Sequence, residues 1–191
     1  MAETSAKFVS RAGDKLQGAL DAMGLDVRGF VCADFGCNVG GFTDCLLQRG
    51  ARKVYAIDTG YGELAWRLRK DARVVVMERT NALYCDVTEL VDLVVVDVAW
   101  TPQAMAVPAA LRWLKPGGQI ISLLKPHYEL AKQLGHAPRE GLSPQQTRQI
   151  VLDTCEALGR HGAQVQAVMR SVLLGKGGNE EFLLNIRPAS F

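Results

Sequence analysis

The feature that most constrains this chain is a glycine-rich stretch between an apolar segment and a sequence with helical spacing. It reads Asp34-Phe35-Gly36-Cys37-Asn38-Val39-Gly40-Gly41-Phe42-Thr43. Residues 30–32 before it are apolar, and apolar residues after it recur at the spacing of one helix face. The order strand, glycine turn, helix is typical of the first unit of an open α/β sheet, where a nucleotide-like ligand binds.

The positions of the glycines indicate which ligand this turn accepts. A dinucleotide-binding turn has the spacing G-x-G-x-x-G, whereas here Asp34 and Gly36 precede the pair Gly40 and Gly41. An acidic residue inside the turn suits a ligand with a cationic group or hydroxyls better than a pyrophosphate. We therefore predict that the turn binds S-adenosylmethionine (SAM), whose amino and sulfonium groups are cationic; the alternative is a glycine-rich turn without a ligand. The predicted binding residues of the turn are Asp34, Gly36, Cys37, Asn38, Gly40, Gly41 and Phe42.

Length and composition limit the possible domain organisation and location. A chain of 191 residues is long enough for one domain with its own core, so we expect a single domain over residues 1–191, with residues 1–29 as an N-terminal helical extension. The five cysteines are odd in number and contain no C-x-x-C pair, which indicates neither a disulfide framework nor a zinc site. We expect no metal and a cytoplasmic location. No apolar run is long enough to span a bilayer, so no membrane partner is expected.

Further apolar segments alternate with helical sequence after the glycine turn. Strands are expected at residues 53–58, 73–77, 91–97 and 119–124, and a C-terminal hairpin at residues 163–172 and 182–187. The run 91–96 is continuously apolar apart from Asp92, as in a strand that is buried on both faces. We predict a Rossmann-like α/β fold with a doubly wound, mostly parallel, seven-stranded sheet and one antiparallel strand near the C-terminus.

Polar side chains follow these predicted strands, at the edge where ligands bind to parallel sheets. Asp58 ends the second strand, about 20 residues after the turn, where an acid typically hydrogen-bonds ribose hydroxyls; the alternative is a helix or turn cap. Glu78 or Asn81, after the third strand, would contact an adenine ring, and the sequence does not choose between them. Asp97 and Lys125 end the fourth and fifth strands, where a lysine is unusual unless its ammonium is used.

The connections between these segments give three further expectations. Pro102 is expected to start a helix that Trp113 completes and residues 115–118 stop. Residues 128–142 are expected to form a lid or substrate loop. Ser143 is expected to begin a long helix.

Five motifs along nearly the whole chain, taken in order, resemble one known family. They are residues 8–16, 40–47, 78–81, 125–129 and 178–183. The sequence resembles the FtsJ-like methyltransferases in these motifs, and most of all the branch of TlyA haemolysin-type ribosomal RNA 2′-O-methyltransferases. The resemblance implies SAM as the cofactor and RNA, in particular ribosomal RNA or a ribosomal subunit, as the partner.

The resemblance also implies a catalytic tetrad of lysine, aspartate, lysine and glutamate. Carried over by motif, the four residues are Lys15, Asp97, Lys125 and Glu181. Spacing alone would make Lys15 a solvated surface lysine. Lys125 is the candidate base for the ribose hydroxyl proton, Asp97 would orient it, and Glu181 would position Lys15 or the ribose. The alternative is a surface cluster of ion pairs.

The sequence departs from the family pattern in places that concern the RNA target. TlyA-type proteins usually carry a small RNA-binding domain before the catalytic one, and this chain is expected to lack it. Residues 98–100, His127 and Tyr128 also differ from the residues expected there. Candidate phosphate contacts are Arg11, Arg67, Arg69, Lys70, Arg139 and Lys176.

Two other functions stay open at the level of sequence. One is SAM-dependent methylation of a protein or a small molecule, which would keep the cofactor site. The other is a non-catalytic module that binds SAM or RNA, against which an intact tetrad argues. We expect a monomer or a weak dimer.

Overall fold

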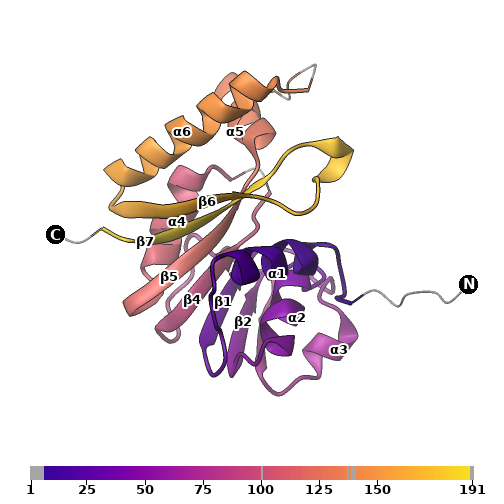
Figure 1. Ribbon diagram of the computed structural model, residues 1–191. Helices are drawn as coiled ribbons and strands as arrows, with labels where there is room; N and C mark the ends of the chain where they lie inside the picture. The colour runs from indigo at the N-terminus through magenta and orange to yellow at the C-terminus, as the bar shows by residue number, and fades with distance from the viewer. Residues whose placement is uncertain (1–6, 100, 137, 139–140, 190–191) are drawn as a thin grey trace, which may run out of the picture.

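A mixed sheet of seven strands lies between two layers of helices in the computed structural model, which describes residues 7–99, 101–136, 138 and 141–189 (Figure 1). The strand order is β3-β2-β1-β4-β5-β7-β6. The strands are β1 (Val31–Phe35), β2 (Lys53–Ile57), β3 (Val74–Met77), β4 (Val91–Val96), β5 (Leu114–Leu124), β6 (Ala163–Arg170) and β7 (Phe182–Pro188). Within it β7 is antiparallel to both of its neighbours, and the pairs from β3 to β5 are parallel. The predicted sheet is therefore confirmed.

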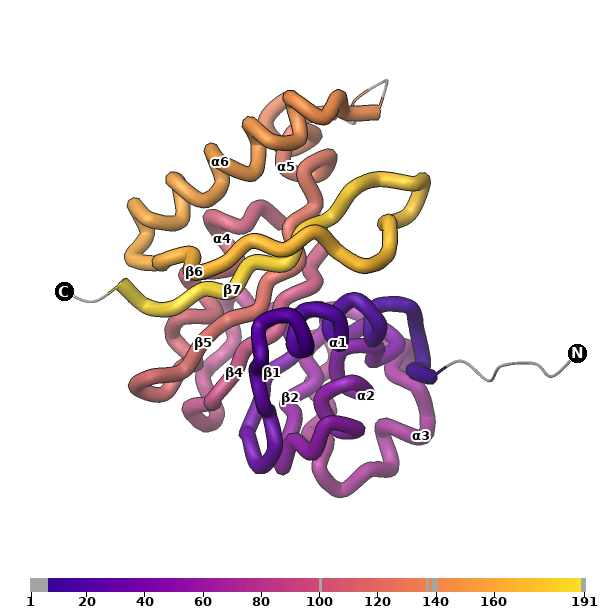
Figure 2. Tube along the Cα trace, viewed as in Figure 1, coloured from indigo at the N-terminus to yellow at the C-terminus, as the bar shows by residue number. Residues whose placement is uncertain are grey.

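Helices cover both faces of this sheet, as Figure 2 also shows along the Cα trace. They are α1 (Ala12–Ala22), α2 (Gly41–Gln48), α3 (Trp66–Arg69), α4 (Gln103–Leu111), α5 (Pro126–Leu134) and α6 (Pro144–Arg160), with a 3-10 turn η1 (Lys176–Gly178). The first three pack on one face and α4 and α6 on the other, while α5 packs against α6. Among the described residues, no helix is long and apolar enough to cross a membrane.

The two faces of the sheet carry separate apolar cores. On one face Leu16 and Leu20 of α1 join Leu46 of α2 over the strands. On the other face the Trp113 ring is fully buried, and its centroid lies 5.8 Å from the ring centroids of Phe35 and of Tyr55 in edge-on contacts. All five residues of β1 are buried, as expected for a parallel strand with helices on both sides.

The sequence-based prediction for residues 113–118 is wrong. Helix α4 ends at Leu111, and β5 already begins at Leu114. Trp113 lies in the core, where its carbonyl accepts a hydrogen bond of 2.7 Å from the Val91 N–H. Pairing with the start of β4 thus outweighs the turn-forming preference of the following proline and glycines.

The expected loop over residues 128–142 is also wrong for its first half, because α5 is helical as far as Leu134. Pro126 occupies the first turn of α5, where proline is favourable. Arg139 lies outside the described residues. The predicted start of α6 is confirmed: the Ser143 side chain accepts from the Gln146 N–H at 3.2 Å, and the Gln146 side chain accepts from the Ser143 N–H at 2.9 Å.

Candidate active site

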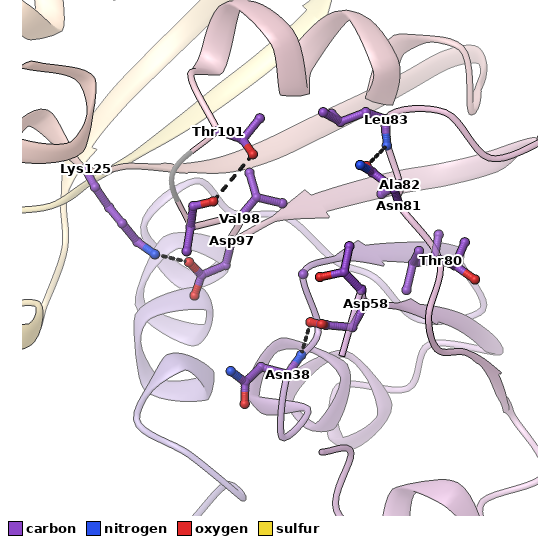
Figure 3. Close-up of a pocket in the computed structure, with 14 residues that line it drawn as sticks. Asn38, Asp58, Thr80, Asn81, Ala82, Leu83, Asp97, Val98, Thr101 and Lys125 are labelled. Carbon is purple, nitrogen blue, oxygen red and sulfur yellow. Dashed lines mark hydrogen bonds and ion pairs between the residues drawn. The ribbon is translucent and has the colours of Figure 1, made fainter. Parts of the chain in front are cut away.

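A cavity of about 350 Å³ opens beyond the carboxyl ends of the central strands (Figure 3). In Figure 3 Lys125 and Asp97 stand at one side of it, and Asn81 and Leu83 stand across from them. A neighbouring hollow of about 250 Å³ shares Gly36, Asn38 and Asp97 with the cavity. The two spaces therefore meet at the glycine turn and the end of β4.

The glycine turn is held by the side chain of Asp58, which lines the cavity. Its Oδ2 accepts from the Asn38 N–H at 2.9 Å, and its Oδ1 accepts from the Gly60 N–H at 2.7 Å. Asn38 has a φ of 48°, in the left-handed region that residues with a side chain rarely adopt. Gly40 has a φ of 98° and caps the N-terminus of α2, so glycine suits this position. The turn thus places the N-terminus of α2 at the hollow, which Gly41 and Phe42 line.

Asp34 lies within β1 rather than in the turn that follows it, which corrects the sequence-based placement. Its Oδ2 accepts from the Thr43 N–H at 2.9 Å and from the Thr43 hydroxyl at 2.7 Å, which ties β1 to α2. Its Oδ1 is buried and has no hydrogen-bond partner among the described residues. Burial raises the pKa of Asp34 to about 7, although the hydrogen bonds from Thr43 act in the other direction. Asp34 also lines the hollow.

The first of two ion pairs within the predicted tetrad lies at one side of the cavity. Lys125 Nζ lies 2.5 Å from Asp97 Oδ1. Both residues come directly after neighbouring parallel strands, β5 and β4, and both line the cavity. The Lys125 ammonium also lies 5.6 Å from the centroid of the Tyr128 ring. The lysine is therefore held at the cavity wall by a carboxylate and an aromatic face.

The second ion pair within the predicted tetrad joins α1 to the residue just before β7. Lys15 and Glu181 form a buried ion pair, with 11% and 4% of their side chains exposed. Lys15 is thus not a solvated surface lysine, as spacing alone had suggested. The register places Glu181 beside Lys125, since Leu124 of β5 pairs with Phe182 of β7 and the two charged residues are the next positions outward. The structure brings the four predicted residues together as two adjacent ion pairs.

Two of the residues predicted to bind the cofactor lie outside both spaces. An added Cβ at Gly40 would meet the side chains of Leu64 and Leu68, so this glycine serves the packing of α3. Glu78 forms an ion pair with Arg69 and accepts from the Gly62 N–H at 2.7 Å. The Arg69 guanidinium lowers the pKa of Glu78. Asn81, by contrast, lines the cavity.

The remaining predicted residues of the turn line one or both spaces. Gly36 and Asn38 line both, while Cys37, Gly41 and Phe42 line the hollow. Sequence reasoning missed further lining residues that are neighbours of predicted ones in the chain. They are Ile57, Thr59, Thr80, Ala82, Leu83, Val98, Ala99 and Thr101 in the cavity and Ser10, Ala12 and Val39 in the hollow. The strand ends indicated most of these positions, whereas Ser10 and Ala12 follow no strand and were covered only by the motif of residues 8–16 that carries the family resemblance.

The basic residues named as phosphate contacts differ in their surroundings. Arg67 and Arg69 are engaged in ion pairs with Asp44 and Glu78. The other described candidates lie at the surface: Arg11 donates to the Leu174 carbonyl at 3.0 Å, Lys70 lies 4.8 Å from the centroid of the Trp66 ring, and Lys176 is exposed.

The residues present fit SAM, and the structure offers two independent observations for this. The unpartnered Oδ1 of Asp34 supplies a buried acceptor for a cationic amino group. Asp58, at the end of β2, presents a carboxylate to the cavity at the place where sheets of this kind bind a ribose. No group of three or more His, Cys, Asp or Glu side chains is arranged to hold a metal ion in the described part of the chain.

Comparison with known proteins gives consistent matches. The model of the FtsJ-like methyltransferase family matches residues 8–187. The chain is 42% identical over 188 residues to the 16S/23S rRNA (cytidine-2'-O)-methyltransferase TlyA of Mycobacterium tuberculosis, a match that covers 94% of this chain and 68% of that protein. A solved structure of a candidate hemolysin from Streptococcus thermophilus superposes with a TM-score of 0.87 at 31% identity, covering 99% of this chain and 70% of that one. A second, from Lactococcus lactis, gives 0.85 at 32% identity, with 95% and 89% covered. The chain belongs to the FtsJ-like methyltransferase family, whose members use SAM.

Proposed function

We propose that this protein transfers the methyl group of SAM to a ribose 2′-hydroxyl of ribosomal RNA. The observation that carries the proposal is the Lys125–Asp97 pair at the wall of the cavity, with the buried Lys15–Glu181 pair beside it. The relative from Mycobacterium tuberculosis, which is named as an rRNA cytidine-2'-O-methyltransferase, supports the choice of substrate. A ribosomal RNA substrate would place the protein in the cytoplasm.

The cavity and the hollow would bind different parts of the cofactor. Asp34 would accept from the amino group of the cofactor in the hollow, since its Oδ1 has no other donor among the described residues. Asp58 would accept from the ribose hydroxyls, and Asn81 and Leu83 would flank the adenine. Asp97 lines both spaces, so it would lie between the amino group of the cofactor on one side and its ribose and adenine on the other. When bound, SAM supplies a methyl group that is already activated on a sulfonium cation.

Catalysis at this site requires a positioned hydroxyl and an acceptor for its proton. Lys125 is the side chain of the tetrad that reaches the cavity together with Asp97, so we assign it the role of the base. An ammonium cannot accept a proton, so Lys125 must give one up before it takes the proton of the hydroxyl. Asp97 holds the Lys125 amine in place through its 2.5 Å contact. Orientation of the hydroxyl toward the methyl group is the larger part of the expected rate gain.

The Lys15–Glu181 pair would act beside this centre. Because Glu181 neutralises Lys15, the two together add little net charge next to Lys125. Their burial fixes both side chains, which favours a role in positioning the ribose over a role in binding phosphates. Phosphates would be met by exposed basic residues such as Arg11 and Lys176.

The experiment that tests the function is methyl transfer from radiolabelled SAM to a panel of acceptors. Free ribosomal RNA, isolated ribosomal subunits and a protein extract are each incubated with the wild-type chain, and labelled RNA is digested to nucleosides. We expect label in RNA as a 2′-O-methyl nucleoside. Label in protein or small molecules alone would reject the RNA substrate, and bound SAM with no transfer to any acceptor would reject the proposed enzyme activity.

A further inference from the structure

The connection between β6 and β7 lies against one face of α1, and it does so beside the Lys15–Glu181 pair. Three residues of that face make the contacts, Arg11, Lys15 and Gly18, at spacings of four and three. Arg11 donates to the Leu174 carbonyl at 3.0 Å, and Lys15 pairs with Glu181. In Figure 1 this connection, drawn in yellow, projects from the sheet above α1.

The third contact depends on the absence of a side chain at Gly18. A Cβ added there would lie 2.6 Å from Val172 Cγ1 and 3.1 Å from Val172 Cγ2, both closer than packed carbon atoms approach. Val172 has 58% of its surface exposed, so the connection is free to yield outward. A larger residue at position 18 would therefore push Val172 away from α1 rather than distort the backbone of α1.

Displacement of Val172 would also shift Glu181, because one hydrogen bond links the chain next to Val172 to Glu181. Ser171, the residue before Val172, donates its N–H to the Glu181 carbonyl at 2.8 Å. Glu181 in turn packs on Gly175, where an added Cβ would overlap its carboxylate. Lys15 and Gly18 are one turn apart on the same helix. The Gly18–Val172 contact and the Lys15–Glu181 pair are thus linked at both ends, through α1 on one side and through the Ser171–Glu181 hydrogen bond on the other.

We infer that Gly18 and Val172 are positioning residues for the Lys15–Glu181 pair, and that the volume at position 18 sets the rate of methyl transfer. The inference rests on the proposed function, because it takes the pair to act in that reaction. Neither residue lines the cavity or the hollow, so SAM affinity should not depend on them.

The test is a double-substitution cycle measured by turnover. Gly18→Ala should lower kcat by roughly ten- to a hundredfold, the range that a small misplacement near the reacting groups costs. The same substitution made together with Val172→Ala should lower kcat by under about twofold relative to Val172→Ala alone, because the smaller side chain leaves room for the new methyl group. KM for SAM should stay unchanged throughout. An equal loss in both backgrounds, or no loss in either, would overturn the inference.

Gly159→Ala is the matched control, because Gly159 lies within α6 and an added Cβ there meets no atom within 4 Å. Both substitutions replace a helical glycine by alanine, so the helix-propensity term has the same sign in both; it is smaller for Gly159, which lies in the last turn of α6, than for Gly18 in α1. Gly159→Ala should keep the wild-type kcat.

Hydrogen exchange separates failure of this inference from failure of the proposed function. Gly18→Ala should speed exchange of the Ser171 amide, and adding Val172→Ala should slow it again, whether or not the protein methylates RNA. Unchanged exchange at Ser171 in Gly18→Ala would overturn the inference even if Lys125→Ala abolishes methylation. Conversely, faster exchange at Ser171 in Gly18→Ala together with no RNA methylation by the wild type would count against the proposed function. It would still support the structural link between Gly18, Val172 and Glu181.

Discussion

Lys125 and Lys115 mark the two ends of β5, and each forms an ion pair with an aspartate from β4 or its end. Lys125 Nζ lies 2.5 Å from Asp97 Oδ1, and Lys115 Nζ lies 2.9 Å from Asp92 Oδ1. The pairs have the same chemistry and join the same two strands. They differ in place, since Lys125 and Asp97 line the cavity and Lys115 and Asp92 do not. The second pair is therefore an internal control for the first.

Asp34 should make stability fall as the pH rises. Its pKa is raised by burial to about 7, from 3.8 for an ordinary aspartate. Between these two values the unfolded chain has released a proton that the folded protein still holds, so rising pH favours unfolding, and the effect ends above about pH 7. From pH 5 to 7 this one group should cost about 2–3 kcal/mol of the free energy of unfolding. Urea unfolding of wild type and Asp34→Asn at both pH values measures it; equal pH slopes in the two proteins would contradict it.

Asp34 should also make SAM binding depend on pH. A cationic amino group next to Asp34 favours the carboxylate, so binding below about pH 7 must release the proton. Kd for SAM should fall as the pH rises to about 7 and then level off, by up to about tenfold per unit. Asp34→Asn should bind more weakly at pH 8 and lose this dependence. Calorimetry in buffers of different ionisation enthalpy measures the released proton directly, and a binding reaction that releases none would argue against the contact.

Asp58→Asn should weaken SAM binding by roughly ten- to a hundredfold, because a charged acceptor for the ribose hydroxyls becomes a neutral one. The substitution keeps an oxygen for one of the backbone donors that Asp58 now holds, at Asn38 and Gly60. Glu78→Gln is the comparison, since Glu78 lies outside the cavity. It should leave the Kd for SAM near the wild-type value. A larger loss of affinity in Glu78→Gln than in Asp58→Asn would reverse the assignment.

Gly36→Ala should disturb both stability and binding, because two effects coincide at this position. Gly36 has a φ of 81°, and an added Cβ would lie 2.6 Å from the Asp97 carbonyl oxygen. Gly62→Ala isolates the first effect, since Gly62 has a φ of 79° and open space around it. Gly62→Ala should cost about 1–2 kcal/mol from backbone strain alone. Gly36→Ala should cost more and also weaken SAM binding; equal melting temperatures for the two variants would show that Asp97 does not restrict this position.

The parallel sheet and the residues at its edge were predictable because both depend on local pattern. Apolar runs mark the strands, and Asp58, Asp97 and Lys125 each stand at or just beyond the end of one. Lys15 is different. Its sequence spacing suggested a surface position, and its burial depends on Glu181, which follows it by 166 residues and reaches it through the β6–β7 connection. Contacts of that kind leave no periodic signal, and only the family resemblance indicated the pair.

Two errors have the same physical origin, which is that tertiary pairing overrides local preference. Residues 115–118 contain a proline and two glycines, yet they continue β5 because Trp113 and Leu114 pair with the start of β4. Asp34 was assigned to the turn because it follows the apolar residues 30–32, yet it belongs to β1, where the Thr43 N–H and hydroxyl donate to its carboxylate. A sequence pattern does not show that hydrogen bonds from one hydroxyl and one backbone amide offset the burial of an acid.

The most direct test of the account is single-turnover methyl transfer by Lys125→Ala and Lys115→Ala with saturating SAM. Lys125→Ala should lose at least about a hundredfold in rate, the contribution typical of a general base, while it still binds SAM within a few fold of wild type. Lys115→Ala should transfer methyl groups at the wild-type rate, with at most a small loss of stability. Full turnover by Lys125→Ala, or an equal loss in both variants, would contradict the assignment of Lys125 as the base.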